Sequence, residues 1–333
     1  MNPKTETPDI SHRIRLASIL LSLFGGMIIL GIKYYAALIS NSSALRSDAL
    51  EGTVNVLAAA FGLGSILFAE KPADQDHPYG HGKIEYFAQA FEGGLISLAG
   101  FLILIDTILR FVHHETPKAL GLGLKLSVIS GILNGLIGIS IYRIGKKYVS
   151  QTLVADGIHL LSDLVTTIAL ASGLLIYYFT GYSWIDPLLA IGIAFFLFKT
   201  GFNLVHASSK ALLDAENPEI LKQIVDQLNS IPRGKIITAH ELKAQQFGRD
   251  THVDLHVVVP EYLSIKEAHH EADLISRALR ERLGFNSEVH THIDPCERDF
   301  CGECSEANCS IRVSPFQRQE PFTVSEITKP GKH

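Results

Sequence analysis

The chain has 333 residues, of which 47% are hydrophobic and 19% charged, with a formal net charge of −5 and a mean hydropathy of +0.22. This hydrophobicity is high for a soluble domain but ordinary for a chain half embedded in a membrane, and the mild charge argues against a nucleic-acid partner. Charge is concentrated in residues 211–333, which hold 34 of the 63 charged side chains. An apolar part therefore precedes a polar one.

The first 210 residues contain six apolar segments, each long enough to cross about 30 Å of hydrocarbon. Such spans are expected to be helical, because every backbone N–H and C=O must be bonded within the segment. A very apolar soluble helical domain is the alternative, but six consecutive segments of this length are hard to bury in one domain. The segments are 15–38, 42–69, 84–111, 120–142, 152–180 and 185–206.

Basic residues flank these spans unevenly, and this bias predicts the orientation. They lie before the first span, between the second and third, between the fourth and fifth, and after the sixth: Arg13, Arg15, Lys71, Lys83, Arg143, Lys146, Lys147 and Lys210. We therefore expect a multi-pass protein of the plasma (inner) membrane with both termini in the cytoplasm. Residues 1–14 are expected to be a cytoplasmic segment and 15–210 the transmembrane domain, with no signal peptide.

From residue 217 the pattern becomes that of a small soluble domain. It contains two amphipathic helical segments and three alternating, strand-like segments. In chain order these are 219–229, 235–244, 251–259, 265–283 and 288–293. The order α-β-β-α-β predicts an α+β domain of the ferredoxin-like, heavy-metal-binding type over residues 211–296, with helices on one face of a sheet.

Residues 297–333, rich in Cys, Pro and Glu, are predicted to be a flexible tail without a core of its own. All four cysteines fall in Cys296-x4-Cys301-x2-Cys304-x4-Cys309, so they cannot form a chain-wide disulfide framework. They could bind one metal as four thiolates or remain reduced and unligated, and the spacing leaves both interpretations open.

The second and fifth spans carry matched polar motifs, Asp48-Ala-Leu-Glu51-Gly-Thr-Val-Asn55 and Asp156-Gly-Ile-His159-Leu-Leu-Ser-Asp163. Both place polar residues at positions 0, +3 and +7, on one face of a helix. A charged group at mid-span costs at least about 2.5–3.5 kcal/mol, so each needs a reason.

The predicted metal quartet is Glu51, Asn55, His159 and Asp163. If the two helices face each other, these residues offer one imidazole nitrogen and three oxygen donors, which suit Zn²⁺, Fe²⁺, Co²⁺ or Mn²⁺. Interhelical hydrogen bonds or a proton relay without metal are the alternative, and the matching of two helices favours metal.

Two further clusters contain metal-binding residue types. Asp74, His77 and His81 can converge on one ion if the intervening turn folds them together, although a solvated turn fits the spacing equally well. The C-terminal domain holds seven histidines between His240 and His292. Their interleaving with carboxylates on adjacent strands predicts metal binding there.

Together these features resemble the cation diffusion facilitator family, and most closely its bacterial zinc and ferrous-iron efflux branch. The resemblance rests on six spans, the paired motifs, the loop ending Gly80-His81-Gly82-Lys83 and the domain ending His292-Ile-Asp294-Pro-Cys296, and covers about residues 10–296. It implies a homodimer that exports a divalent transition metal in exchange for protons. Zn²⁺ and Fe²⁺ are the first candidates, followed by Co²⁺, Cd²⁺ and Mn²⁺.

The resemblance also implies three metal sites. The transport site would be the quartet, the loop site would be Asp74, His77 and His81, and the cytoplasmic site would draw on His240, His256, His269, His292 and Asp294. The family usually has Asp or His and then Asp in the second span, where this chain has Glu51 and Asn55. With His159 neutral, two negative charges remain to balance one M²⁺, and the choice of metal stays open.

We expect no enzymatic activity and no prosthetic group. His240-Glu241 and His270-Glu271 both lack the second histidine of a His-Glu-x-x-His motif, and no nucleophile accompanies the quartet. A membrane-bound metal sensor or storage scaffold without flux is the alternative to a transporter. Carboxylates at matched depth in two spans favour transport, because a sensor does not need them there.

Overall fold

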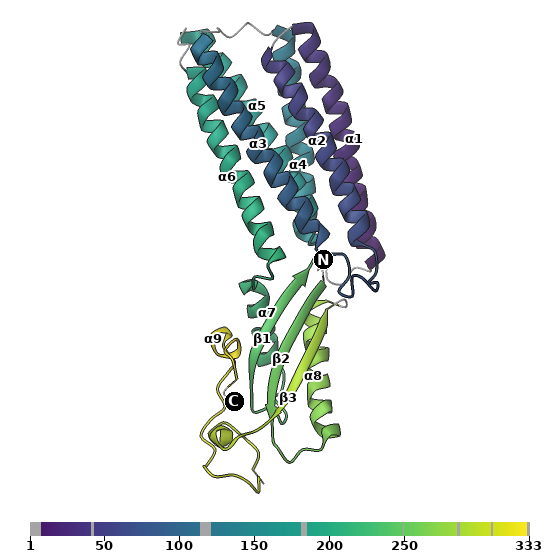
Figure 1. The fold of residues 1–333 in the computed structure, drawn as a ribbon, viewed down its shortest axis with the longest axis vertical. Coiled ribbons are helices and arrows are strands. Elements are labelled where there is room, and N and C mark those ends of the chain that lie inside the picture. Colours follow the sequence, from purple (N-terminus) through teal and green to yellow (C-terminus); the bar gives the residue numbers. More distant parts are fainter. Residues whose placement is uncertain are drawn as a thin grey trace. The chain divides into compact units, whose positions relative to one another are not determined.

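The computed structural model describes residues 8–40, 43–113, 121–180, 185–248, 250–284, 287–307 and 309–331. The side chains of some helical residues, among them Glu51, lie outside this description. The chain divides into two compact units, Met1–Leu213 and Asp214–His333, and each is described by itself (Figure 1).

The N-terminal unit consists of helices that confirm the six predicted spans. They are α1 (Pro8–Ser40), α2 (Ser43–Ala69), α3 (Ile84–His113), α4 (Gly121–Lys147), α5 (Gln151–Thr180) and α6 (Ile185–Leu212). Each contains a stretch long and apolar enough to cross a membrane. Large side chains such as Phe24, Leu98 and Phe195 are more than half exposed on the helices, as expected for a surface that faces lipid. Some helices extend past the predicted spans, because a helix can continue into water beyond the hydrocarbon.

Small residues allow close helix packing, as is usual inside membranes. Helix α5 packs against α4, and α3 packs against α6. A Cβ added at Gly157 of α5 would lie 2.7 Å from the backbone nitrogen of Tyr142 in α4, and one at Gly93 of α3 would lie 2.8 Å from the carbonyl oxygen of Gly201 in α6. Of the six spans α5 is the most buried, so its polar motif faces protein rather than lipid.

A buried ion-pair network joins one end of four helices. Arg15 of α1, which is 2% exposed, pairs with Glu85 at the start of α3 and, over 3.1 Å, with Glu70 just after α2. The Ser150 hydroxyl, just before α5, donates to Glu85 over 2.6 Å. Removing one partner of a buried pair typically costs about 3–5 kcal/mol. The network therefore fixes both ends of the loop between α2 and α3.

The C-terminal unit has the predicted order α-β-β-α-β. Its elements are α7 (Pro218–Ser230), β1 (Thr238–Phe247), β2 (Asp250–Val259), α8 (Ile265–Leu283) and β3 (Glu288–Pro295). The sheet order is β1-β2-β3, with β1 antiparallel and β3 parallel to β2. A parallel pair needs a long connection, which α8 provides.

The two helices cover one face of this sheet. Val253, Leu255 and Val257 of β2 share a core with Ile224 of α7 and Ile275 of α8. Because side chains alternate along a strand, the residues between these valines and leucines point to the opposite face. That second face carries His240, His256 and His292.

The segment after β3 is packed against the domain, which differs from the flexible tail that the sequence predicted. It contains a 3₁₀ turn, η2 (Arg298–Gly302), and a short helix, α9 (Val324–Ile327). Ile327 is fully buried in the core of the domain, and Asn229 of α7 exchanges two 2.8 Å hydrogen bonds with the backbone of Phe322. The segment thus adds apolar side chains to the core of the domain.

Candidate metal sites

The polar motifs of α2 and α5 meet inside the helical unit. The Asn55 side-chain amide donates to Asp163 Oδ2, and Asn134 of α4 donates to the same oxygen over 3.0 Å. Asp163 is 2% exposed, and His159, one turn earlier on α5, is 5% exposed. The structure thus brings Asn55 and Asp163 together beside a buried His159, whereas the side chain of Glu51 lies outside the described residues.

A lysine from α1 completes this cluster. Lys33 is 2% exposed, and its Nζ lies 3.9 Å from Asp163 Oδ2. Lys33, Asn55 and Asn134 also line one cavity between the helices. Asp163 therefore faces two amides and an ammonium, all groups that stabilise its negative charge. We call Lys33, Asn55, Asn134, His159 and Asp163 the membrane cluster.

Sequence reasoning missed two members of the membrane cluster. Lys33 could have been found, because a charged residue within an apolar span is expensive and is a functional candidate by itself. Asn134 gave no such signal, since it is neutral and the fourth span contains several other small polar residues.

Two further acids are buried in the helical unit. Glu92 of α3 and Asp156 of α5 are 1% and 3% exposed and interact electrostatically with each other. Asp156 accepts a hydrogen bond from Ser22. All three polar residues of the fifth-span motif, Asp156, His159 and Asp163, are therefore buried.

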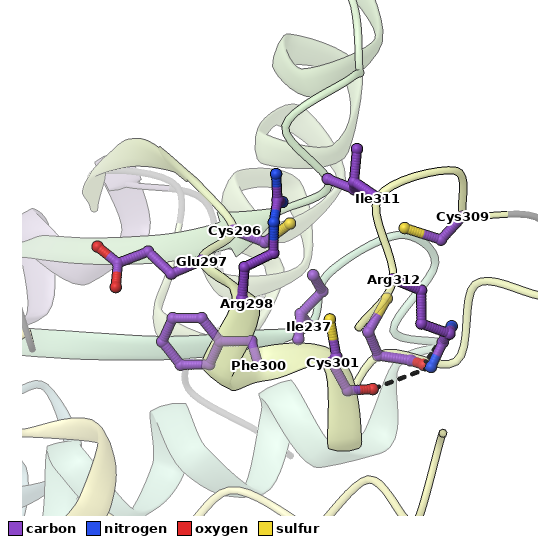
Figure 2. A pocket seen from close by; sticks show the side chains of 10 residues that line it. Ile237, Cys296, Glu297, Arg298, Phe300, Cys301, Cys309, Ile311 and Arg312 are labelled. Atoms are coloured by element: carbon purple, nitrogen blue, oxygen red, sulfur yellow. Dashed lines mark hydrogen bonds between the residues drawn. The ribbon is translucent and has the colours of Figure 1, made fainter. Parts of the chain in front are cut away.

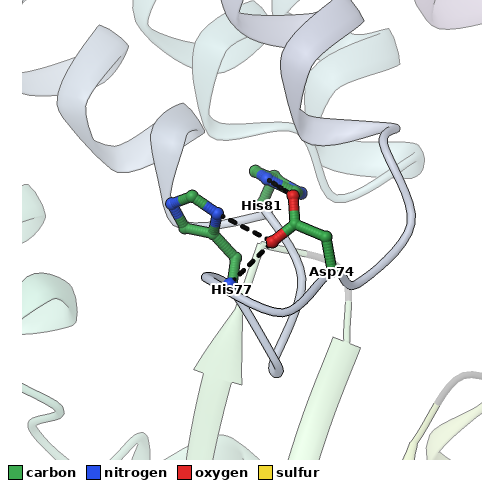
Figure 3. Close-up of side chains that lie close together, drawn as sticks. All are labelled: Asp74, His77 and His81. Carbon is green, nitrogen blue, oxygen red and sulfur yellow. Dashed lines mark hydrogen bonds and ion pairs between the residues drawn. The ribbon is translucent and has the colours of Figure 1, made fainter.

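The loop between α2 and α3 brings its three predicted residues together. Asp74 Oδ1 lies 3.1 Å from His77 Nδ1, and Asp74 Oδ2 lies 3.3 Å from His81 Nε2 (Figure 3). One ligand atom from each residue lies within 4.8 Å of the others, which is close enough for one ion. Gly80, at φ 79°, provides the left-handed turn between the two histidines.

The surroundings prepare this loop site for a cation. The backbone N–H of His77 donates to Asp74 and holds the pKa of its carboxyl below the ordinary value. His81 Nδ1 lies 3.3 Å from the carbonyl oxygen of Lys71, which can only accept, so a hydrogen bond here puts the proton on Nδ1. The Nε2 lone pair of His81 is then directed toward Asp74, as metal ligation requires.

Three histidines form a row across the C-terminal sheet. His240 pairs with His256 in the register of β1 and β2, and His256 pairs with His292 in the register of β2 and β3. The ring centroids of His240 and His256 are 5.2 Å apart, and those of His256 and His292 are 4.6 Å apart. The row lies on the sheet face opposite α7 and α8.

The carboxylate of Asp294 contacts all three histidines of this row. Its Oδ2 lies 3.0 Å from His256 Nδ1 and 3.5 Å from His240 Nε2, while its Oδ1 lies 3.3 Å from His292 Nε2. Ligand atoms of His240, His256 and Asp294 all lie within 4.8 Å of one another. We call these three residues and His292 the histidine row.

His269, the remaining predicted ligand, does not join the histidine row in this chain. It lies on α8 with its side chain 72% exposed, next to Asp273 at 3.7 Å. Helix α8 packs on the other face of the sheet, so the sheet separates His269 from the row. The prediction rested on the family resemblance and did not consider which face of the sheet the helix would cover.

The end of the chain closes over the histidine row. The Gly331 N–H donates to Glu241 over 3.1 Å and lowers the pKa of that carboxyl, and the Glu241 N–H donates to the carbonyl of Lys329 over 3.0 Å. A Cβ at Gly331 would collide with Nε2 of His240. Glu241 itself has φ 51° at a register shift in β1, next to His240.

Comparison with known families matches both units. A family model described as "Cation efflux transmembrane domain" matches residues 19–213, and one described as "Cation efflux protein, cytoplasmic domain" matches residues 217–296. The chain belongs to the cation diffusion facilitator family. It is therefore a multi-pass membrane protein of a family of cation efflux transporters, not of enzymes.

Relatives of this family member match over most of their length. The chain is 31% identical over 277 residues to the uncharacterized transporter sll1263 of Synechocystis, covering 83% of this chain and 89% of the relative. It is 29% identical over 294 residues to the cation-efflux pump FieF of Shewanella oneidensis, covering 88% and 98%. It is 25% identical over 301 residues to the manganese efflux system protein MneP of Bacillus subtilis, covering 87% and 98%.

Proposed function

We propose that this protein exports a divalent transition metal from the cytoplasm in exchange for protons, with Asp163 at the centre of the transport site. The observation that carries the proposal is the burial of Asp163 among Asn55, Asn134 and Lys33 in a family of cation efflux transporters. A carboxylate in such a place needs a cation, and Lys33 supplies one when metal is absent. Glu51, Asn55, His159 and Asp163 are the proposed ligands.

Lys33 gives the exchange a physical basis. A divalent ion that binds Asp163 has to displace the Lys33 ammonium, because two cations at this distance repel each other. We propose that Lys33 gives up a proton as metal binds and regains one after metal leaves on the other side. Protons also compete with metal for His159, because ligands must be deprotonated to hold a metal ion.

The proposed transport substrate is one or more of Zn²⁺, Fe²⁺, Co²⁺, Cd²⁺ and Mn²⁺. One imidazole and several oxygen donors suit Zn²⁺ and Fe²⁺, which we propose as the first candidates. A site rich in oxygen donors also suits Mn²⁺, and one relative is named a manganese efflux protein.

The remaining two sites are proposed to serve the same transport. The loop site Asp74, His77 and His81 would bind metal at one end of the helical unit, and the histidine row would bind cytoplasmic metal in the C-terminal domain. We propose a homodimer in the plasma (inner) membrane with both termini in the cytoplasm. The match of residues 217–296 to the cytoplasmic domain of cation efflux proteins supports this arrangement.

The test is metal flux into proteoliposomes that are acidic inside, with each candidate metal supplied outside. Wild type would be compared with Asp163→Ala and with Asp226→Ala, which changes an exposed acid on α7. We expect uptake of one or two metals coupled to proton exit, lost in Asp163→Ala and retained in Asp226→Ala. Tight metal binding without any flux would overturn the proposal in favour of a sensor or storage scaffold.

A further inference from the structure

The four cysteines of the chain converge on one pocket. Cys296 follows β3, Cys301 lies in η2, and Cys304 and Cys309 lie in the loop beyond it. All four line the same cavity, where the sulfurs of Cys296, Cys301 and Cys309 point toward the same space (Figure 2). Cys301 and Cys304 are only 8% and 6% exposed. None of the four is in a disulfide.

Backbone hydrogen bonds hold this segment to the sheet and give it a fixed shape. The Cys296 N–H donates to the carbonyl of Val259 over 2.8 Å. Inside the loop, the Arg312 guanidinium donates to the carbonyl oxygens of Cys301 and Cys304 over 3.0 and 2.8 Å. It also donates to the carbonyls of Glu306 and Ser314. One cation thus gathers the backbone around the pocket.

Hydrophobic burial accounts for only part of this order, through Cys304, which is buried with Ile237 and Val258 while Cys296 and Phe300 pack against them. Between Cys296 and Arg312 the only large apolar side chains are Phe300 and Ile311. Small segments with so little core are usually held by disulfides or by a metal. The family model describes this domain as cytoplasmic, and a reducing cytoplasm disfavours disulfides, so four thiols around one pocket favour a metal.

We propose that Cys296, Cys301, Cys304 and Cys309 bind one Zn²⁺ as a tetrahedral four-thiolate site. Four sulfur donors favour Zn²⁺ over Fe²⁺, Co²⁺ and Mn²⁺, and a closed set of protein ligands is typical of a structural rather than a transport site. Binding releases four protons from four thiols and leaves a centre of charge −2. Arg298 and Arg312 line the same pocket, and Arg298 also pairs with Glu261 over 3.1 Å.

The cysteine site is connected through the chain to the histidine row. Cys296 comes two residues after Asp294 of the histidine row. After the cysteines, the Gln317 N–H bonds the carbonyl of Gly302 over 2.8 Å, and the chain then continues to Gly331 beside His240. The zinc site therefore anchors the start of the path that connects Asp294 to Gly331 beside His240. Cys296 is the last residue of the matched cytoplasmic domain, and the other three cysteines lie beyond both regions that the family models match.

The first test is zinc content of the purified full-length protein after brief chelation of loosely held metal. We expect about one retained Zn²⁺ per protomer in wild type, lost in the Cys301→Ser/Cys304→Ser double variant. Ser305→Ala/Ser310→Ala is the matched control and should retain it, as should Cys309→His, which keeps four ligands. Asp163→Ala should also retain it, so this result does not depend on the transport proposal.

Cobalt substitution identifies the ligands directly. Co²⁺ in the wild-type site should show thiolate-to-metal charge transfer and the intense visible bands of tetrahedral geometry, both absent in the double cysteine variant. Cobalt bound without thiolate bands would overturn the proposal. So would a mass corresponding to two disulfides, or acid-labile sulfide with iron at the site. Cysteines that react with maleimide equally fast before and after complete removal of zinc by a strong chelator would overturn it too.

Discussion

The membrane cluster and the histidine row are both groups of donors around one carboxylate, but they are assembled in different ways. Asp163 receives its partners from α1, α2 and α4, and each partner either donates a hydrogen bond or carries positive charge. Asp294 receives three histidines from adjacent strands in register, each of which can also act as a metal ligand. The first arrangement already contains a cation, whereas the second has only neutral or titratable partners.

This difference follows from the solvent. Within a membrane a carboxylate without a partner is costly, so a transport site needs a substitute cation between two rounds of transport. At the surface of a small domain, water can solvate the carboxylate, so the metal ligands need no substitute cation when metal is absent. The comparison predicts that removing the lysine changes the membrane cluster much more than any single change affects the histidine row.

The largest effect is expected for Lys33→Met. Loss of the competing ammonium should tighten metal binding at the membrane cluster by about tenfold or more, since each factor of ten corresponds to about 1.4 kcal/mol. It should also reduce the number of protons exchanged per metal by one. Isothermal titration at several pH values would measure both. Lys199→Met, an exposed lysine of α6, is the control and should leave affinity and proton number unchanged.

If Lys33→Met binds metal as weakly as wild type and releases the same number of protons, Lys33 has no part in the exchange. Adding Asp163→Asn sharpens the result. Because Lys33 acts through Asp163, its substitution should have no further effect on metal affinity once Asp163 is neutral.

The same contrast explains how much could be read from the sequence. Alternation along a strand places His292 and Asp294 on one face, and in the structure both belong to the histidine row. The six spans were predictable from length and hydrophobicity alone. Lys33 and Asn134 were missed because no local periodicity tells which helices become neighbours. The docking of Ile327 was missed for the same reason. The four residues of α9 are too short for a helical periodicity, and the core that buries Ile327 is formed by α7, α8 and the sheet.

His256→Ala should break the histidine row without abolishing transport. His256 lies in the middle of the row and contacts Asp294 at 3.0 Å, so its loss should lower metal affinity of the C-terminal domain by about tenfold. Flux should fall only a few-fold, because the membrane cluster is intact. His269→Ala is the matched control. It should change neither quantity, and a loss of metal in that variant would show that His269 is a ligand in the assembled protein.

Asp74→Asn should weaken the loop site by about fivefold to tenfold, because it removes the one carboxylate between two imidazoles. The pH dependence of metal binding at the loop site shows whether protonation of Asp74 contributes to the loss of metal. A carboxyl whose pKa lies below the ordinary value, as for Asp74, stays ionised while pH falls from about 7.5 to 5.5. Loss of metal over this range would therefore not come from protonation of Asp74. Asp76→Asn, its exposed neighbour, is the control, and an equal loss in both variants would contradict the role of Asp74.

Gly331→Ala should have the smallest effect. It tests whether Gly331 stays beside His240 when the histidine row binds metal. The added methyl group would collide with Nε2 of His240, whereas a methyl group at Gly302 would meet its nearest atom, in Gln317, at 3.7 Å. Gly302→Ala is therefore the control. Metal affinity of the C-terminal domain should fall by about threefold in Gly331→Ala, with no change at the membrane cluster. An unchanged affinity would mean that Gly331 leaves His240 when metal binds. The hydrogen bond from Gly331 to Glu241 would then belong to the metal-free domain only, and the chain end would compete with metal instead of supporting its ligands.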